Sequence, residues 1–317
     1  MLNGKKLLLT LVDTGGTLRA RYVVLKGHAV RAEGHCAVGD LPADGALRIA
    51  FLSRSSYFDR VEVEAKSRKM LSFKARSQVD AALAFSEPFR MCFSASKLGP
   101  GRQQLSLVAV SEADFAVASA YLPLQSRVCE RFVLVESAIA ALVAQATKEA
   151  ANVLWLRGED LFGLLVENGV VLSRLVDRAA AMGGGDEALL ERLERMRASL
   201  RSTARRVFPD REIALHLALG ELAGKPNARG EGPVARHDIV SSTLELRLAE
   251  AFTGVQPQAV LRWPEVFGLL TLDSDYSLLD RSYQERAWAK KFALGLGAAL
   301  FVSGLVAGIA TLTRYFN

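Results

Sequence analysis

The sequence predicts an α/β protein built from two lobes of similar design, followed by one transmembrane helix near the C-terminus. Two triplets of strand-like segments predict the lobes, because they share one layout and begin about 146 residues apart. The third observation is an uncharged run of 21 residues, Phe292–Leu312. As a helix, such a run spans roughly 31 Å, which is about the thickness of one hydrocarbon core.

The first triplet opens the chain. It consists of the apolar run Leu7–Val12, a DTGG turn, the alternating segment Thr17–Leu25, a Lys26-Gly27 turn and the segment His28–Cys36. Alternation with a period of two, interrupted by short turns, predicts three strands in hairpin succession.

The second triplet follows the same order. It consists of Val153–Leu156, an RGED turn, Leu161–Glu167, an Asn-Gly pair and Val170–Val176. Asn-Gly between alternating apolar residues is a strong hairpin signal. The two triplets agree in layout and not in residue identity, so two independent β-meanders are the alternative to a duplication.

The segments around the triplets alternate between strand and helix patterns. Leu105–Val110 predicts a buried strand, and Glu112–Tyr121 predicts a short helix. Val128–Ala151 is rich in Ala, Leu and Val and predicts one long helix across a lobe. Ile213–Leu219 predicts another apolar strand.

A strongly amphipathic helix is predicted over Glu187–Phe208. One face carries an apolar stripe formed by Leu189, Leu190, Leu193, Met196 and Leu200. The opposite face carries six arginines, Arg192, Arg195, Arg197, Arg201, Arg205 and Arg206. A solvated face is the simple interpretation, and contact with a partner or with phospholipid is the alternative.

Composition narrows the class of protein. The net charge of +6 and pI of about 9.3 come from scattered basic residues, so they do not predict nucleic-acid binding, and they suit apposition to anionic lipid. Cys36, Cys92 and Cys129 are widely spaced, which predicts reduced thiols in a cytosolic fold and no metal site.

Charges around the apolar run predict its orientation. Four basic residues precede the run, whereas only Arg314 follows it, and no signal peptide opens the chain. Since cytoplasmic flanks carry the excess of Lys and Arg, the large N-terminal part is predicted to face the cytoplasm. The predicted organisation is lobe I at 1–150, lobe II at 151–280, a basic collar at 281–291, the membrane helix at 292–312 and a periplasmic end at 313–317.

Small residues mark one side of the predicted membrane helix. Gly304 and Gly308 form a GxxxG motif, and Gly297 lies on roughly the same side. Small residues at this spacing allow two helices to approach closely, so we expect a homodimer or pairing with other single-span subunits through this face.

The sharpest chemical motif is the turn formed by Asp13, Gly15, Gly16 and Thr17. An Asp at a strand end can hold a metal-bound water, and glycines let backbone N–H groups approach a phosphate. These residues are therefore candidates for a phosphate loop that binds ATP with Mg²⁺. The alternative is an ordinary hairpin turn, since Asp, Thr and Gly are all turn formers.

The rest of a nucleotide site is missing from the sequence. Leu156 stands where a second catalytic Asp is expected, and leucine cannot position a metal or a water. We interpret the following turn, residues 157–160, as an exposed turn of mixed charge, and the alternative is that Glu159 and Asp160 substitute for the missing Asp. After Ile213–Leu219 there is no close glycine pair to receive an adenosine. No catalytic residue and no cofactor are predicted, with nucleotide binding without turnover as the alternative.

Two passages resemble the actin-like cytoplasmic proteins of type IV pilus and type II secretion platforms, the PilM and GspL families. The passage Glu130–Asp177 is similar to their crossing from the first lobe into the second, and Thr10–Gly27 is similar to their opening phosphate hairpin. Asp13, Gly15 and Thr17 match the first phosphate motif of these families, while the second phosphate and adenosine motifs are not preserved. The topology is nearer to that of GspL.

The resemblance implies a two-lobed actin-like fold, of the duplicated RNase H-like type, and a scaffold at the bacterial inner membrane. Such a scaffold would dock the cytoplasmic assembly ATPase or a partner's peptide, and its helix would contact lipid and other platform subunits. The alternative function is a membrane-tethered ATP-binding actin-like ATPase or a sugar-kinase-like enzyme.

Overall fold

The computed structural model describes most of the two lobes and parts of a helix near the C-terminus. The described residues are 5–14, 17–27, 29–42, 45–120, 129–158, 160–178, 186–213, 215–222, 257–272 and 276–279, together with 247, 289, 292–293, 296–297 and 300–306. The account below is restricted to these residues.

The first sheet has five strands in the order β3-β2-β1-β4-β8. The bounds in chain order are Lys5–Thr14 for β1, Thr17–Lys26 for β2, Ala29–Ala37 for β3, Ala46–Phe51 for β4 and Cys129–Leu134 for β8. β1 to β3 form successive hairpins, whereas β4 pairs in parallel with both β1 and β8. Leu7, Leu8 and Leu9 are all fully buried, because both faces of this sheet are covered.

The second sheet repeats this design with four strands in the order β11-β10-β9-β12. The bounds are Ala151–Arg157 for β9, Asp160–Glu167 for β10, Val170–Asp177 for β11 and Leu215–Gly220 for β12. β9 pairs antiparallel with β10 and parallel with β12, as β1 does with β2 and β4. The predicted duplication is therefore confirmed in topology.

A third, antiparallel sheet is inserted between β4 and β8, in the order β5-β7-β6. Its strands are β5 (Ser56–Glu64), β6 (Phe89–Gly99) and β7 (Arg102–Ser111), with α1 (Arg68–Ala81) packed on one face. A short 3-10 turn η1 (Val38–Asp40) precedes β4, and α2 (Glu112–Ala120) follows β7. Leu71 of α1 packs against Leu105 and Leu107 of β7.

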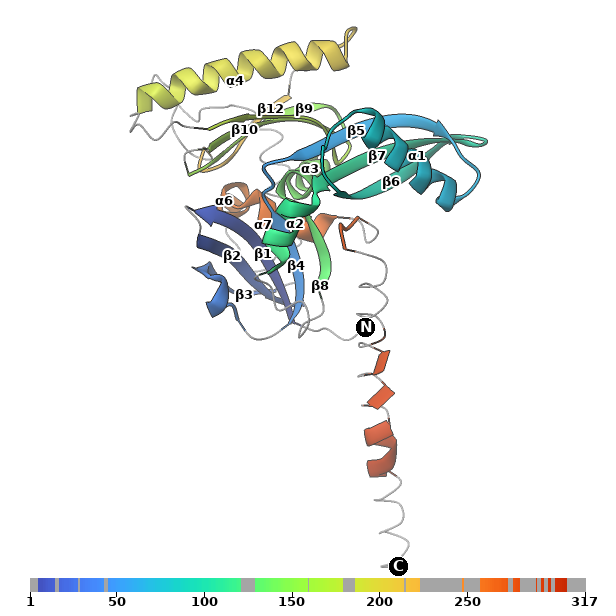
Figure 1. The fold of residues 1–317 in the computed structure, drawn as a ribbon. Helices are drawn as coiled ribbons and strands as arrows, with labels where there is room; N and C mark the ends of the chain where they lie inside the picture. Colours follow the sequence, from blue (N-terminus) through green and yellow to red (C-terminus); the bar gives the residue numbers. More distant parts are fainter. Residues whose placement is uncertain are drawn as a thin grey trace, which may run out of the picture.

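Two helices fill the space between the first and second sheets (Figure 1). α3 (Val135–Ala146) is buried over most of its length, and α7 (Pro264–Thr271) packs against it after the short α6 (Pro257–Arg262). A Cβ at Gly268 of α7 would lie 2.0 Å from the carbonyl oxygen of Ala138, so only glycine permits this approach. The main core cluster accordingly joins Leu8 of the first sheet to Trp155 of the second.

The outer face of the second sheet is covered by α4 (Asp186–Val207), as predicted for Glu187–Phe208 (Figure 1). Leu193, Met196 and Leu200 form its buried stripe. Their contact with the sheet is close, because a Cβ at Gly163 of β10 would meet the Met196 sulfur at 2.6 Å.

The single helix predicted over Val128–Ala151 is wrong. Cys129–Leu134 forms β8, and the helix occupies only Val135–Ala146 before β9 begins at Ala151. Periodicity cannot separate a buried strand from a buried helix in a continuous apolar run. The aromatic and β-branched residues Phe132 and Val133 suit the strand, which is buried beside β4.

The predicted membrane helix, Phe292–Leu312, lies only in part within the described residues. Residues 292–293, 296–297 and 300–306 are helical and project away from the sheets (Figure 1). Phe292, Leu300 and Phe301 are each more than half exposed. Within the described ranges, none of the helices combines the length and the apolar character needed to cross a bilayer.

Candidate functional site

The first hairpin turn holds the residues predicted to form a phosphate loop. Thr14 and Thr17 close this turn, and Asp13 faces Leu18 across it. Gly15, Gly16 and the side chains of Asp13 and Thr17 lie outside the described residues. Their predicted role therefore stays a prediction.

The second hairpin turn is the equivalent position in the duplicated lobe. Arg157 pairs with Asp160 at its close, as Thr14 pairs with Thr17, so Leu156 stands at the register position of Asp13. Leu156 is buried in an apolar cluster beneath α4. The register position equivalent to Asp13 is therefore occupied by a leucine.

The prediction that this turn carries only exposed, mixed charges is wrong for Arg157. Its side chain is 5% exposed, and Nη1 donates a hydrogen bond to Glu265 Oε1 at 2.9 Å. Glu265 lies in the first turn of α7 and is fully buried. The partner comes from 108 residues further along the chain, which is why the local sequence gives no sign of the contact.

Two further residues extend this pair into an ion network. Arg21 of β2 lies 3.5 Å from Glu265 and 3.4 Å from Glu221, which directly follows β12. Glu221 also accepts a hydrogen bond of 3.0 Å from the backbone N–H of Gly158. We call Arg21, Arg157, Glu221 and Glu265 the interlobe clamp, because they join the first sheet, both neighbouring strand ends of the second sheet and α7.

The charges of the interlobe clamp balance, with two guanidinium groups and two carboxylates. Burial lowers the pKa of Arg157 to about 10, an effect that the carboxylate of Glu265 opposes, so Arg157 remains protonated at neutral pH. Each carboxylate faces at least one guanidinium group, while Oε2 of Glu265 is buried without a hydrogen-bond partner among the described residues. The arrangement is therefore suited to holding the lobes together.

The last residue of β12, next to the interlobe clamp, is packed closely against β9. Gly220, the last residue of β12, has a φ of +69°, and a Cβ there would lie 2.5 Å from the carbonyl oxygen of Leu156. It would also lie 2.6 Å from Cδ1 of Trp155. The adenosine turn was expected directly after this strand, and the strand end is packed against β9.

His35 lies at the edge of the interlobe clamp. It faces Arg21 across the β2–β3 pair, and its ring meets Trp263 edge-on with centroids 5.1 Å apart. Burial and the positive charges of Arg21, Arg157 and Arg262 lower the pKa of His35. Burial is the larger of these causes, and both burial and the nearby guanidinium groups favour the neutral imidazole.

A second buried ion pair joins the lobes on the far side of α3. Arg174 of β11 lies 2.7 Å from Glu136, the second residue of α3, and Glu136 is fully buried. Arg174 also donates to Ser56 Oγ at 2.9 Å and to the Ser53 carbonyl at 2.8 Å. Burial raises the pKa of Glu136, and Arg174 opposes that shift.

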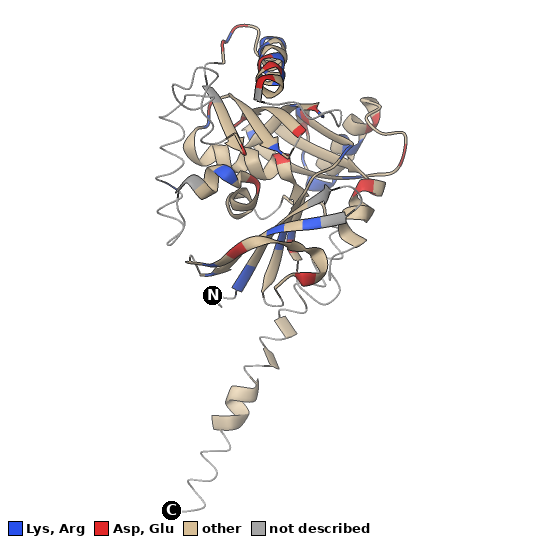
Figure 2. Cartoon of the chain, turned by 90° about the vertical axis from the view of Figure 1, so that its left-hand side faces the viewer, with Lys and Arg blue, Asp and Glu red and all other residues tan. Residues whose placement is uncertain are grey.

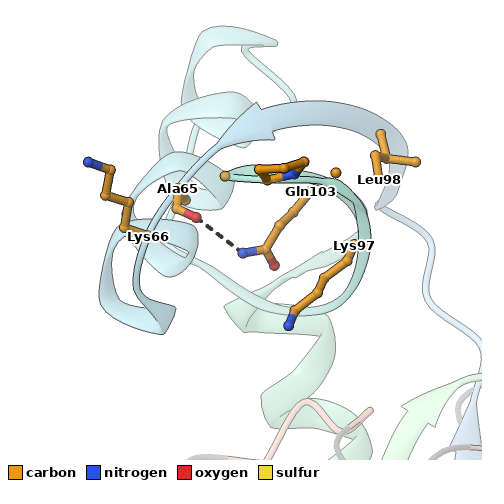
Figure 3. A pocket seen from close by; sticks show the side chains of 8 residues that line it. Ala65, Lys66, Lys97, Leu98 and Gln103 are labelled. Carbon is orange, nitrogen blue, oxygen red and sulfur yellow. Dashed lines mark hydrogen bonds between the residues drawn. The ribbon is translucent and has the colours of Figure 1, made fainter.

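A surface hollow lies apart from these contacts, at the outer end of the third sheet (Figure 3). It is lined by Ala65, Lys66, Lys97, Leu98, Gly99, Pro100, Gly101 and Gln103. Gln103 Nε2 donates to the carbonyl of Ala65 at 3.2 Å, which fixes one wall. Its lining contains no carboxylate, histidine or thiol, and its titratable side chains are those of Lys66 and Lys97, both exposed.

The duplicated sheets, with α3 and α7 between them, define the two-lobed actin-like class of fold. Two solved structures have this fold: a chain of the PilM-PilN type IV pilus biogenesis complex, and the cytoplasmic domain of EpsL, an inner-membrane component of the type II secretion system of Vibrio cholerae. The PilM-PilN chain is 12% identical with a TM-score of 0.57, over 86% of this chain and 98% of that one. EpsL is 13% identical with a TM-score of 0.52, over 88% of this chain and 99% of that one.

The predicted resemblance to PilM and GspL proteins is thus confirmed at the level of fold. No protein-family model matches the chain, and a search of curated proteins finds no match. At such low identity the likeness establishes the fold alone.

Proposed function

We propose that this protein is a non-catalytic scaffold of a type IV pilus or type II secretion-like platform at the bacterial inner membrane. In this role the actin-like lobes bind a cytoplasmic component, and the C-terminal helix anchors them. The fold shared with PilM and with the EpsL cytoplasmic domain supports this class of function.

The contact between Arg157 and Glu265 is the main observation in favour of a non-catalytic function. It lies at the second hairpin turn, where a nucleotide-cleaving enzyme would present backbone N–H groups and a carboxylate to phosphate and metal. Here the N–H of Gly158 is bonded to Glu221, and Leu156 replaces the carboxylate. A charge-balanced contact in this position stabilises one arrangement of the lobes without a nucleotide.

The C-terminal helix supplies the membrane part of the proposal. Its described residues expose large apolar side chains, including Phe292, Phe301 and Val306, which water would solvate poorly. Gly297 and Gly304 have open space around them, which leaves room for a second helix. We infer a single span with the lobes in the cytoplasm, paired through the glycine face with a second copy or with another single-span subunit.

Binding of the machine's cytoplasmic assembly ATPase tests the scaffold function. The full chain, reconstituted in nanodiscs, is expected to retain the purified ATPase equally with and without Mg-ATP. An Asp13→Ala variant is expected to retain it equally well, because the proposed role requires no nucleotide. Loss of retention in the variant, or turnover of ATP by the chain alone, would instead favour a membrane-tethered ATPase or kinase.

A further inference from the structure

α4 carries, from its middle to its C-terminus, a group of arginines without a partner among the described residues. Arg195, Arg201, Arg205 and Arg206 are all exposed, and none has an ion-pair or hydrogen-bond partner among the described residues. We call these four residues the α4 arginine face. No acidic residue lies between Arg195 and Phe208.

The neighbouring arginines of the same helix behave differently. Arg192 donates to Asp177 Oδ2 at 3.1 Å and to the Asp177 carbonyl at 2.7 Å. Arg197 pairs with Glu194 at 2.7 Å. Arg192 and Arg197 are thus matched within the chain, while the α4 arginine face has no such match among the described residues.

Helix stability alone does not account for this face. Cations in the last turn of a helix are favoured by its dipole, which explains Arg205 and Arg206. The effect falls off within one turn, so it does not reach Arg195 or Arg201. Adjacent guanidinium groups also repel one another, which makes the group costly without an anionic partner.

The face is presented on a rigid support. Leu193, Met196 and Leu200 fix the opposite side of α4 on the second sheet, and Met196 fits closely over Gly163. The side chains between the arginines are short, since Ala198 and Ser202 occupy the exposed surface. The guanidinium groups therefore stand clear of the helix surface and can reach a flat partner.

The position of α4 selects the kind of partner. It lies at the end of the molecule opposite the described part of the C-terminal helix, and it carries both basic and acidic residues (Figures 1 and 2). The four arginines of the α4 arginine face are exposed. If that helix lies in a bilayer, α4 points away from the lipid. An anionic membrane is therefore out of its reach.

We propose that the α4 arginine face docks a carboxylate-rich surface of a protein partner on the membrane-distal side. The proposal rests on the proposed function for its expectation of such a partner. Arginine is suited to this contact, because its planar fork binds carboxylates through two parallel hydrogen bonds.

A competition among three anionic probes tests this proposal on the full chain in phosphatidylcholine nanodiscs. The probes are a labelled glutamate-rich peptide, phosphatidylglycerol vesicles and a single-stranded DNA oligonucleotide. The test variant is Arg195→Gln/Arg201→Gln/Arg205→Gln/Arg206→Gln, and a second variant replaces the same four residues by Lys. The matched control changes four other exposed cations, Lys26→Gln/Lys66→Gln/Lys69→Gln/Lys97→Gln.

We expect the glutamine variant to weaken peptide binding about tenfold, since each exposed ion pair contributes modestly. The lysine variant keeps the charge but loses the planar fork, so its affinity should fall between those of the glutamine variant and the wild type, and the control should bind like the wild type. An equal loss in the control would overturn the proposal, because the effect would then be one of net charge. If the glutamine variant lost more affinity for the vesicles or the DNA than for the peptide, the proposal would be overturned as well.

The outcome is independent of the test of the proposed function. Circular dichroism of each variant establishes that the fold is intact before titration. If the wild type retains the assembly ATPase and the glutamine variant binds the peptide like the wild type, the scaffold function is supported. The proposed role of the α4 arginine face is then refuted. If the wild type does not retain the ATPase and the glutamine variant binds the peptide about tenfold more weakly, the scaffold function is refuted. The proposed role of the α4 arginine face is then supported.

Discussion

Arg157 at the end of β9 and Glu265 in the first turn of α7 form a hydrogen-bonded ion pair of 2.9 Å, with both side chains removed from water. The pair lies where the second lobe meets the helix that packs between the sheets. Taking two charges out of water is costly, and the attraction between the two side chains offsets that cost. If one of the two residues is removed, the charge of the other stays buried without its partner.

The first prediction concerns the loss of one member of this pair. Glu265→Ala leaves Arg157 buried without its main counter-charge, and we expect the free energy of unfolding to fall by about 3–5 kcal/mol. The double variant Arg157→Met/Glu265→Leu removes both charges and should recover most of that loss. Urea unfolding of the full chain in detergent, followed by tryptophan fluorescence, measures both effects.

An exposed ion pair serves as the control for this experiment. Arg102 lies 2.6 Å from Glu62, with both side chains more than half exposed. Because exposed pairs contribute about 0–1 kcal/mol, Arg102→Ala should barely change stability. Equal effects at Glu265 and Arg102 would contradict a buried clamp.

The second prediction concerns Gly220. Gly220→Ala places a Cβ 2.5 Å from the Leu156 carbonyl oxygen, in a left-handed backbone conformation. Gly101 has a similar φ of +74° with open space around it, so Gly101→Ala bears only the backbone strain of about 1–2 kcal/mol. Thermal unfolding should show a clearly larger loss for Gly220→Ala. Equal losses of stability in the two variants would contradict this prediction, because the backbone at the end of β12 would then be able to move and accommodate the Cβ.

The third prediction concerns thiol reactivity. Cys92 and Cys129 are buried, and burial raises the pKa of Cys92 to about 12, so thiolate is scarce at both. Cys36 is partly exposed. In the native chain at neutral pH, mass spectrometry after maleimide treatment should therefore show modification of Cys36 first. Modification of Cys92 before Cys36 would contradict the described packing.

The fourth prediction concerns the membrane helix. Val302→Arg places a charge near the centre of the predicted span, at a cost of about 2.5–3.5 kcal/mol on insertion scales. Phe73→Arg makes the same change at another exposed apolar residue, on α1. Carbonate extraction should show reduced membrane retention for Val302→Arg only. Full retention of Val302→Arg would contradict a membrane span there.

Local sequence pattern predicted the two strand triplets, β7, β12, α2 and α4, and it gave no prediction for β4, β5, β6, α1, α6 or α7. Alternation and turn residues predicted both strand triplets, because hairpins are specified by residues close in sequence. It failed at Cys129–Leu134, where an apolar run adjoins a buried helix and both are equally hydrophobic. Only the pairing with β4 distinguishes them.

The candidate site was predictable in part. The leucine at position 156, equivalent to Asp13 of the first turn, is visible in the sequence once the two turns are aligned. The roles of Arg21 and Glu265 are not, since they depend on contacts across 244 residues. The one available signal was Glu265 itself, a carboxylate within the apolar segment Pro264–Thr271, which suggests a buried partner.

The central claim is that the interlobe clamp stabilises the lobes without a nucleotide, and one titration tests it most directly. Isothermal titration calorimetry of Mg-ATP into the full chain in nanodiscs should give no saturable heat, and Asp13→Ala should behave like the wild type. Saturable binding by the wild type that is abolished in Asp13→Ala would contradict the account, because it would show that the first hairpin turn is a working phosphate loop.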